Sequence, residues 1–218
     1  MNVLEDAAGL TQLQALGARS VPVLARGNQF TFAQSTKQIV EFLDLPEEAK
    51  PELPLDELVR RLDKFMAAAL QLLPLMPEDR LATHVPGRPR SYRSLAFHLF
   101  RVVDAFLDAN NGITLMRAMF AEEPAPDADT GSLLQYGGTI RQRFEAWRMS
   151  GDVAADKILP TYYGPQSRHE LLERTTWHCG QHVRQWMMLL EREGVSHPAP
   201  LVAADFKGLP MPQNVWDG

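Results

Sequence analysis

Residues 167–193, with the sequence SRHELLERTTWHCGQHVRQWMMLLERE, decide the fold of this chain. Ser167 and Glu170 have the spacing of a capping box, in which each side chain binds the backbone N–H of the other at a helix N-terminus. Gly194, the residue type that most often follows a helix, comes directly after the segment. The stretch therefore predicts one long helix that ends near Glu193.

One face of this helix carries polar rings at positions that should point into a core. Steps of four and three residues connect Leu171, Thr175, His178, His182, Gln185 and Leu189. His178 and His182 lie four residues apart, so their imidazoles are one turn apart and can converge on one ion. His98 lies on the inward apolar stripe of a second helical pattern at 91–110. Three inward imidazoles match the ligand set of a metal centre with open positions.

Each of these histidines also has a simpler interpretation. A single core histidine is more often a hydrogen-bonded structural residue than a ligand, and HxxxH pairs arise by chance on helices. The metal hypothesis depends on all three rings pointing inward, because burying them without partners would cost on the order of a few kcal/mol. Cys179 is rotated by about 100° from His178 around the helix, so we expect it to pack rather than to act as a fourth ligand.

The chain outside this helix predicts a mainly α protein with a small β-containing start. Residues 1–45 have the order helix, strand, strand, helix, in the segments Glu5–Leu16, Val21–Ala25, Gln29–Phe32 and a helix capped by Ser35. Residues 46–54 form a charged, proline-rich linker. Residues 55–194 contain four helical patterns, at about Leu55–Met76, Ser91–Asn110, Gly131–Met149 and Ser167–Glu193. Residues 195–218 predict an extended tail. The four long patterns indicate a four-helix bundle.

The composition excludes several classes of protein. The 218 residues include 22 Lys and Arg against 27 Asp and Glu, and this net charge of −5, without a long basic run, disfavours nucleic-acid binding. A single cysteine excludes an intramolecular disulfide, a cysteine-based zinc knuckle and a dithiol redox pair. No apolar stretch reaches the roughly 18 residues of a membrane span, and no signal peptide is recognisable, so we expect a soluble, cytoplasmic protein without a membrane partner.

Two segments resemble the DinB-like superfamily, whose four-helix bundles include the YfiT-type metal hydrolases and the thiol-dependent maleylpyruvate isomerases. Residues 94–99, SLAFHL, resemble that family's histidine segment on the second helix, and residues 177–185, WHCGQHVRQ, resemble its HxxxHxxQ helix. The resemblance covers roughly residues 53–193. It implies a divalent nickel, zinc or iron ion bound by His98, His178 and His182, a homodimer, and transfer of low-molecular-weight thiols as one of the activities.

Residues 1–45 are similar to the second half of a glutaredoxin, a thioredoxin-like fold. The stretch Ser20-Val21-Pro22-Val23 resembles the cis-proline loop that holds a thiol tripeptide in that fold. The strand and helix that would carry redox cysteines are missing. The segment is interpreted first as a docking or dimer element and second as a remnant thiol-binding surface that includes Pro22.

These features predict a metal-dependent enzyme, a thiol S-transferase that acts on a small-molecule substrate. Gln185 would orient a ligand or substrate, and Arg184 would meet an anionic group. Two alternatives stay open, a metal-dependent hydrolase of the same fold and a non-catalytic dimeric stress or interaction scaffold. In the scaffold, the histidines would hydrogen-bond to neighbours with no open space beside them.

Overall fold

The chain divides into two compact units, Met1–Pro51 and Glu52–Gly218, and the computed structural model describes residues 6–18, 22–46 and 50–216. The described chain is mainly α-helical with a small antiparallel sheet near the N-terminus, which confirms the predicted fold class. Some residues of the predicted elements lie outside the described residues. They are Glu5 of the first helix, Ser20 of the proline loop, Val21 of that loop and of the first strand, residues 47–49 of the linker and residues 217–218 of the tail.

The first unit has the predicted order of elements. These are α1 (Ala7–Ala15), β1 (Val23–Arg26), β2 (Gln29–Phe32) and α2 (Thr36–Leu43). The strands form an antiparallel hairpin in which Val23 pairs with Phe32. Gly27 has a φ of 62° in the turn, a conformation that glycine adopts without a steric penalty. Ser35 caps α2, because its hydroxyl accepts a hydrogen bond of 3.3 Å from the Gln38 N–H.

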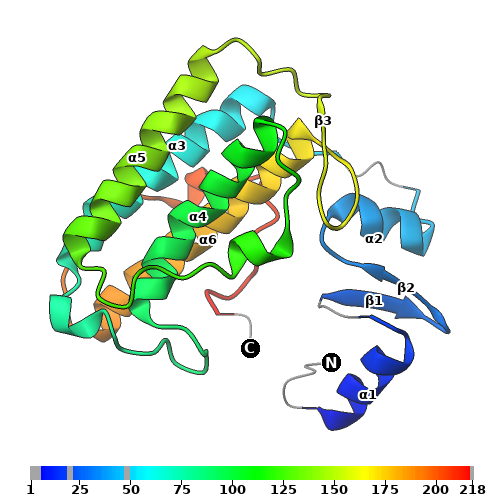
Figure 1. Ribbon diagram of the computed structural model, residues 1–218, viewed down its shortest axis with the longest axis horizontal. Helices are drawn as coiled ribbons and strands as arrows, with labels where there is room; N and C mark the ends of the chain where they lie inside the picture. Colours follow the sequence, from blue (N-terminus) through cyan, green and yellow to red (C-terminus); the bar gives the residue numbers. More distant parts are fainter. Residues whose placement is uncertain (1–5, 19–21, 47–49, 217–218) are drawn as a thin grey trace. The chain divides into compact units, whose positions relative to one another are not determined.

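The second unit is a bundle of four long helices (Figure 1). They are α3 (Leu55–Leu72), α4 (Tyr92–Asn110), α5 (Thr130–Met149) and α6 (Arg168–Arg192). Both α5 and α6 pack against α3 and α4, so the four helices enclose one hydrophobic core. Short pieces connect or follow them: η1 (Leu73–Leu75), η2 (Glu78–Arg80), η3 (Arg117–Phe120), β3 (Ile158–Leu159), β4 (Gln166–Ser167) and η4 (Ala203–Asp205). None of the described helices combines the length and the apolar character needed to cross a bilayer.

Local signals determine where the helices of the bundle begin and end. The predicted capping box is present at α6: the Glu170 carboxylate accepts from the Ser167 N–H at 2.7 Å, and the Ser167 hydroxyl accepts from the Glu170 N–H at 3.2 Å. The helix predicted to reach Met76 instead ends at Leu72. Pro74 has no N–H to continue the hydrogen-bond ladder, so the chain tightens into the 3₁₀ turn η1.

Two glycines allow the helices of the bundle to approach closely. A Cβ on Gly180 would lie 2.7 Å from the ring of Phe65 on α3, and a Cβ on Gly137 would lie 2.6 Å from the ring of Phe100 on α4. Both distances are shorter than atomic contact, so a larger residue would push the helices apart. Gly180 therefore determines how deeply α6 sits in the bundle.

The C-terminal segment, residues 195–216, packs along α3 and α6. Arg61 on α3 donates to the Asp205 carbonyl at 2.9 Å, and Lys64 pairs with the Asp205 carboxylate at 2.6 Å. Further along, the Gln181 amide on α6 donates to the Val215 carbonyl at 2.5 Å. These bonds hold the end of the described chain beside the helix that carries His178 and His182.

Candidate metal centre

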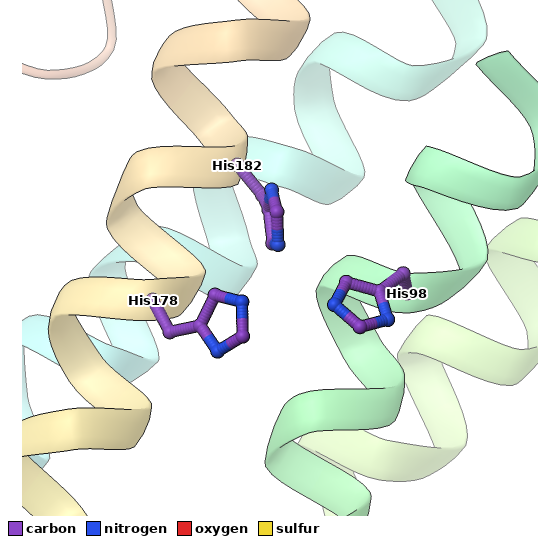
Figure 2. A group of neighbouring side chains, drawn as sticks. All are labelled: His98, His178 and His182. Atoms are coloured by element: carbon purple, nitrogen blue, oxygen red, sulfur yellow. The ribbon is translucent and has the colours of Figure 1, made fainter. Parts of the chain in front are cut away.

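Three histidine side chains from two helices meet inside the bundle. His98 extends from α4, and His178 and His182 extend from adjacent turns of α6 toward it (Figure 2). The ring centroids lie 5.4 Å apart for His98 and His178, 4.9 Å for His98 and His182, and 4.7 Å for His178 and His182. One ring nitrogen from each histidine lies within 4.8 Å of the other two. The three residues predicted from the helical stripes are therefore positioned to hold a metal ion.

Two of the ring nitrogens are buried without a hydrogen-bond partner among the described residues. They are Nδ1 of His98 and Nε2 of His182, on side chains that are only 5% and 7% exposed. Buried polar atoms are nearly always hydrogen-bonded, and leaving one without a partner costs about 1–3 kcal/mol. A metal ion would satisfy both nitrogens at once.

Gln185 determines which nitrogen of His182 is available. Its amide nitrogen donates to the Val215 carbonyl at 3.1 Å, so its oxygen faces the other way and accepts from Nδ1 of His182 at 2.7 Å. Because a neutral imidazole carries one proton, protonation at Nδ1 leaves the lone pair on Nε2. Nε2 is the atom without a partner, and this outer hydrogen bond is of the kind that orients metal-ligating histidines.

The surroundings keep all three rings uncharged at neutral pH. Burial lowers the pKa of His98 from 6.5 to about 2, and repulsion from Arg90 and from His182, when that ring is protonated, adds to this shift. Burial also lowers the pKa of His182 from 6.5 to about 4, although the hydrogen bond with Gln185 opposes this shift. Burial and its histidine neighbours lower the pKa of His178 well below 6.5. Neutral imidazoles have the free lone pairs that metal binding requires.

The donor set fits a divalent transition metal. Three imidazoles suit zinc, nickel and iron, and they match the three protein ligands of catalytic zinc sites. Two nitrogens bound to one ion at about 2.1 Å are at most about 4.2 Å apart. The three ligand nitrogens lie within 4.8 Å of one another, so the rings need to move inward only slightly to bind one ion. Cys179 is not part of this group: it is fully buried in the hydrophobic core, as predicted, and burial raises the pKa of its thiol.

A pocket of about 630 Å³ opens beside the histidines. His178, His182 and Gln185 line it together with the aromatic rings of Phe120 and Trp177. Pro212 and Trp216 of the C-terminal segment complete the wall. The volume lies within the usual range for small-molecule sites, roughly 300–1,000 Å³. A small molecule in this pocket would contact the side chains of His178 and His182.

Of the three residues predicted to bind substrate, Gln185 lines the pocket. Arg184 is not among the described lining residues, and its guanidinium donates to Gln181 at 3.0 Å and to the Pro212 carbonyl at 3.1 Å, which ties down the C-terminal segment. Pro22 belongs to the first unit, where its carbonyl accepts from the Ala33 N–H at 3.0 Å.

Three arginines in the pocket wall were missed by reasoning from the sequence. Arg88 and Arg90 come from the loop before α4, and Arg117 comes from η3. The segment PGRPR at 86–90 lies between two of the predicted helices and has no periodic pattern of its own. Its two arginines directly precede the helix that carries His98, and this proximity was the available signal.

No family model matches this chain, and the search of curated proteins finds no match either. The chemistry of the site itself is therefore the basis for assigning a function.

Proposed function

We propose that this protein is a metal-dependent enzyme of the DinB-like type, which transfers a low-molecular-weight thiol to a small-molecule acceptor. His98, His178 and His182 would hold a divalent nickel, zinc or iron ion. The observation that carries the proposal is the open pocket beside a three-histidine cluster in which two buried nitrogens lack partners among the described residues.

The open pocket favours catalysis over a purely structural role. Structural zinc sites have four protein ligands and are closed, whereas catalytic sites have three and keep a position for water or substrate. Among the described residues, the cluster contains three potential ligands and no fourth. In a scaffold protein the histidines would be hydrogen-bonded within a packed bundle centre, and the unsatisfied nitrogens speak against that alternative.

Thiol transfer fits the pocket better than hydrolysis does. A bound divalent ion would supply Lewis acidity, which lowers the pKa of a coordinated thiol or water. Among the described lining residues, Glu123 is the single carboxylate, and it is exposed. The described lining therefore has no buried carboxylate that could act as the general base of a hydrolysis reaction. The resemblance of residues 1–45 to a thiol-binding fold supports the same choice.

The thiol must come from outside the chain. Cys179 is the single cysteine, and its complete burial and raised pKa prevent it from acting as a nucleophile. In the proposed reaction, the sulfur of the external thiol forms a bond to an electrophilic carbon of the acceptor. The leaving group departs with its bonding electron pair, and the thiol proton passes to solvent. Trp177 and Phe120 provide an apolar wall for the acceptor.

Metal content and thiol transfer in matched variants test the proposal. Purified protein reconstituted with nickel, zinc or iron should hold about one ion per chain, and His98→Ala and His182→Ala should lose it. His84→Ala, at an exposed position, should retain it. The reconstituted protein should accelerate the reaction of glutathione or cysteine with 1-chloro-2,4-dinitrobenzene, which releases chloride. Metal content unaffected by either ligand substitution would refute the site, and a fully loaded protein inactive with every thiol would refute the transfer.

A further inference from the structure

The wall of the pocket carries an excess of positive charge. Its described charged residues, apart from the histidines, are Arg88, Arg90, Arg117 and Glu123. Three guanidinium groups and one carboxylate give a local formal charge of +2, although the whole chain has a net charge of −5. The positive charge is therefore concentrated around the opening that leads to the histidines.

Arg90 is the arginine most closely associated with the metal centre. It is half-buried, and burial lowers its pKa while the charge of Glu123 opposes that shift. No described side chain forms a hydrogen bond with its guanidinium. It lines the same pocket as His178 and His182, whereas the two other arginines of this wall are exposed. Arg90 is therefore the least solvated positive charge in the wall that contains these two histidines.

Beside a bound metal ion, this guanidinium would be stabilised by a further anion in addition to Glu123. A divalent ion held by the three neutral histidines would repel Arg90, and partial burial strengthens that repulsion by reducing solvent screening. An anionic group located between the ion and Arg90 would be attracted by both. Guanidinium groups match planar carboxylates especially well, since two parallel N–H donors can bind the two oxygens.

We propose that the small-molecule substrate of this pocket is an organic acid, whose carboxylate is bound by Arg90 beside the three-histidine centre. This inference rests on the proposed function for the role of the metal, but the carboxylate recognition can be measured separately. Glu123 lies in the same wall, and its negative charge disfavours a dianionic phosphate more strongly than a monoanionic carboxylate. The aromatic rings of Trp177 and Phe120 fit the apolar part of such an acid.

Calorimetric titration with phenylacetate, its neutral analogue phenylacetamide and phenyl phosphate tests the inference. Each probe is titrated into metal-loaded and metal-free protein. Wild-type protein should bind phenylacetate about 10- to 100-fold more tightly than the amide, the range expected for a hydrogen bond to a charged group. Arg90→Gln should bring this ratio close to one while its metal content stays normal, and Arg90→Lys should retain part of it. Arg148→Gln, which removes an exposed arginine paired with Glu145 on α5, should preserve the full ratio.

The outcomes separate this inference from the proposed function. Equal binding of phenylacetate and the amide by metal-loaded protein would overturn the inference and leave the metal centre intact. A preference that survives in Arg90→Gln, or tighter binding of phenyl phosphate than of phenylacetate, would also overturn it. A protein that binds no metal but keeps an Arg90-dependent preference for phenylacetate would support the carboxylate site and refute the metal-dependent function.

Discussion

Acidification should destabilise the metal-free protein strongly between pH 8 and pH 5.5. Burial lowers the pKa of His98 from 6.5 to about 2 and that of His182 to about 4, and it lowers the pKa of His178 well below 6.5. In the unfolded chain the same rings titrate near 6.5. The unfolded state therefore binds more protons than the folded state. Stability is fully present above pH 6.5 and is lost as the pH falls toward the folded-state pKa values.

The size of this effect follows from the protonation of the unfolded chain. At pH 5.5, a histidine with a pKa of 6.5 that stays neutral in the folded state favours unfolding by about 1.4 kcal/mol. His98 and His182 together should remove about 3 kcal/mol, a large share of a typical total stability of about 5–15 kcal/mol, and His178 adds to this loss. The carboxylates of the unfolded chain contribute little in this window, because their pKa values are near 4.

Urea denaturation of EDTA-treated protein, followed by tryptophan fluorescence at both pH values, measures this loss. The variant His98→Leu should lose about 1.4 kcal/mol less than wild-type protein on acidification. His84→Leu, at an exposed position, controls for replacing a histidine by leucine. A wild-type loss below about 1 kcal/mol, or an equal loss in His98→Leu, would refute the view that these rings are held neutral by burial.

Two further substitutions test how the chain supports the site. Gln185→Ala should weaken metal binding by about 10- to 100-fold in a competition titration, because His182 loses the acceptor at Nδ1. Gln181→Ala also releases Val215, but the side-chain hydrogen bonds of Gln181 go to Asn214, Val215 and Arg184 rather than to a histidine. This variant should have little effect on metal binding, and an effect equal to that of Gln185→Ala would assign the loss to the C-terminal segment. Gly180→Ala should destabilise by about 1–3 kcal/mol in urea, because its Cβ would overlap the Phe65 ring. Gly138→Ala, with no atom near the added Cβ, should be neutral or slightly stabilising, and similar results for both glycines would contradict the packing argument.

Features that depend on neighbouring residues could be predicted from the sequence. The capping box of Ser167 and Glu170 and the cap at Ser35 use hydrogen bonds within three residues, so the residue types alone locate them. The adjacent positions of His178 and His182 follow from the pitch of a helix. The end of α3 was predicted too late because Pro74, three residues before Pro77, already interrupts the ladder.

The sequence by itself therefore determined the mainly α fold, most helix ends and the inward direction of the three histidines, since helical periodicity is a property of the local chain. Only the tertiary structure decided which nitrogens converge and which stay without a partner, because that depends on how closely α4 and α6 approach. It also decided that Arg90, Arg117 and Trp216 share one pocket with the histidines. These residues lie in a loop, in the short 3₁₀ helix η3 and in the C-terminal segment, where no periodic pattern indicates direction, and long-range packing alone brings them together.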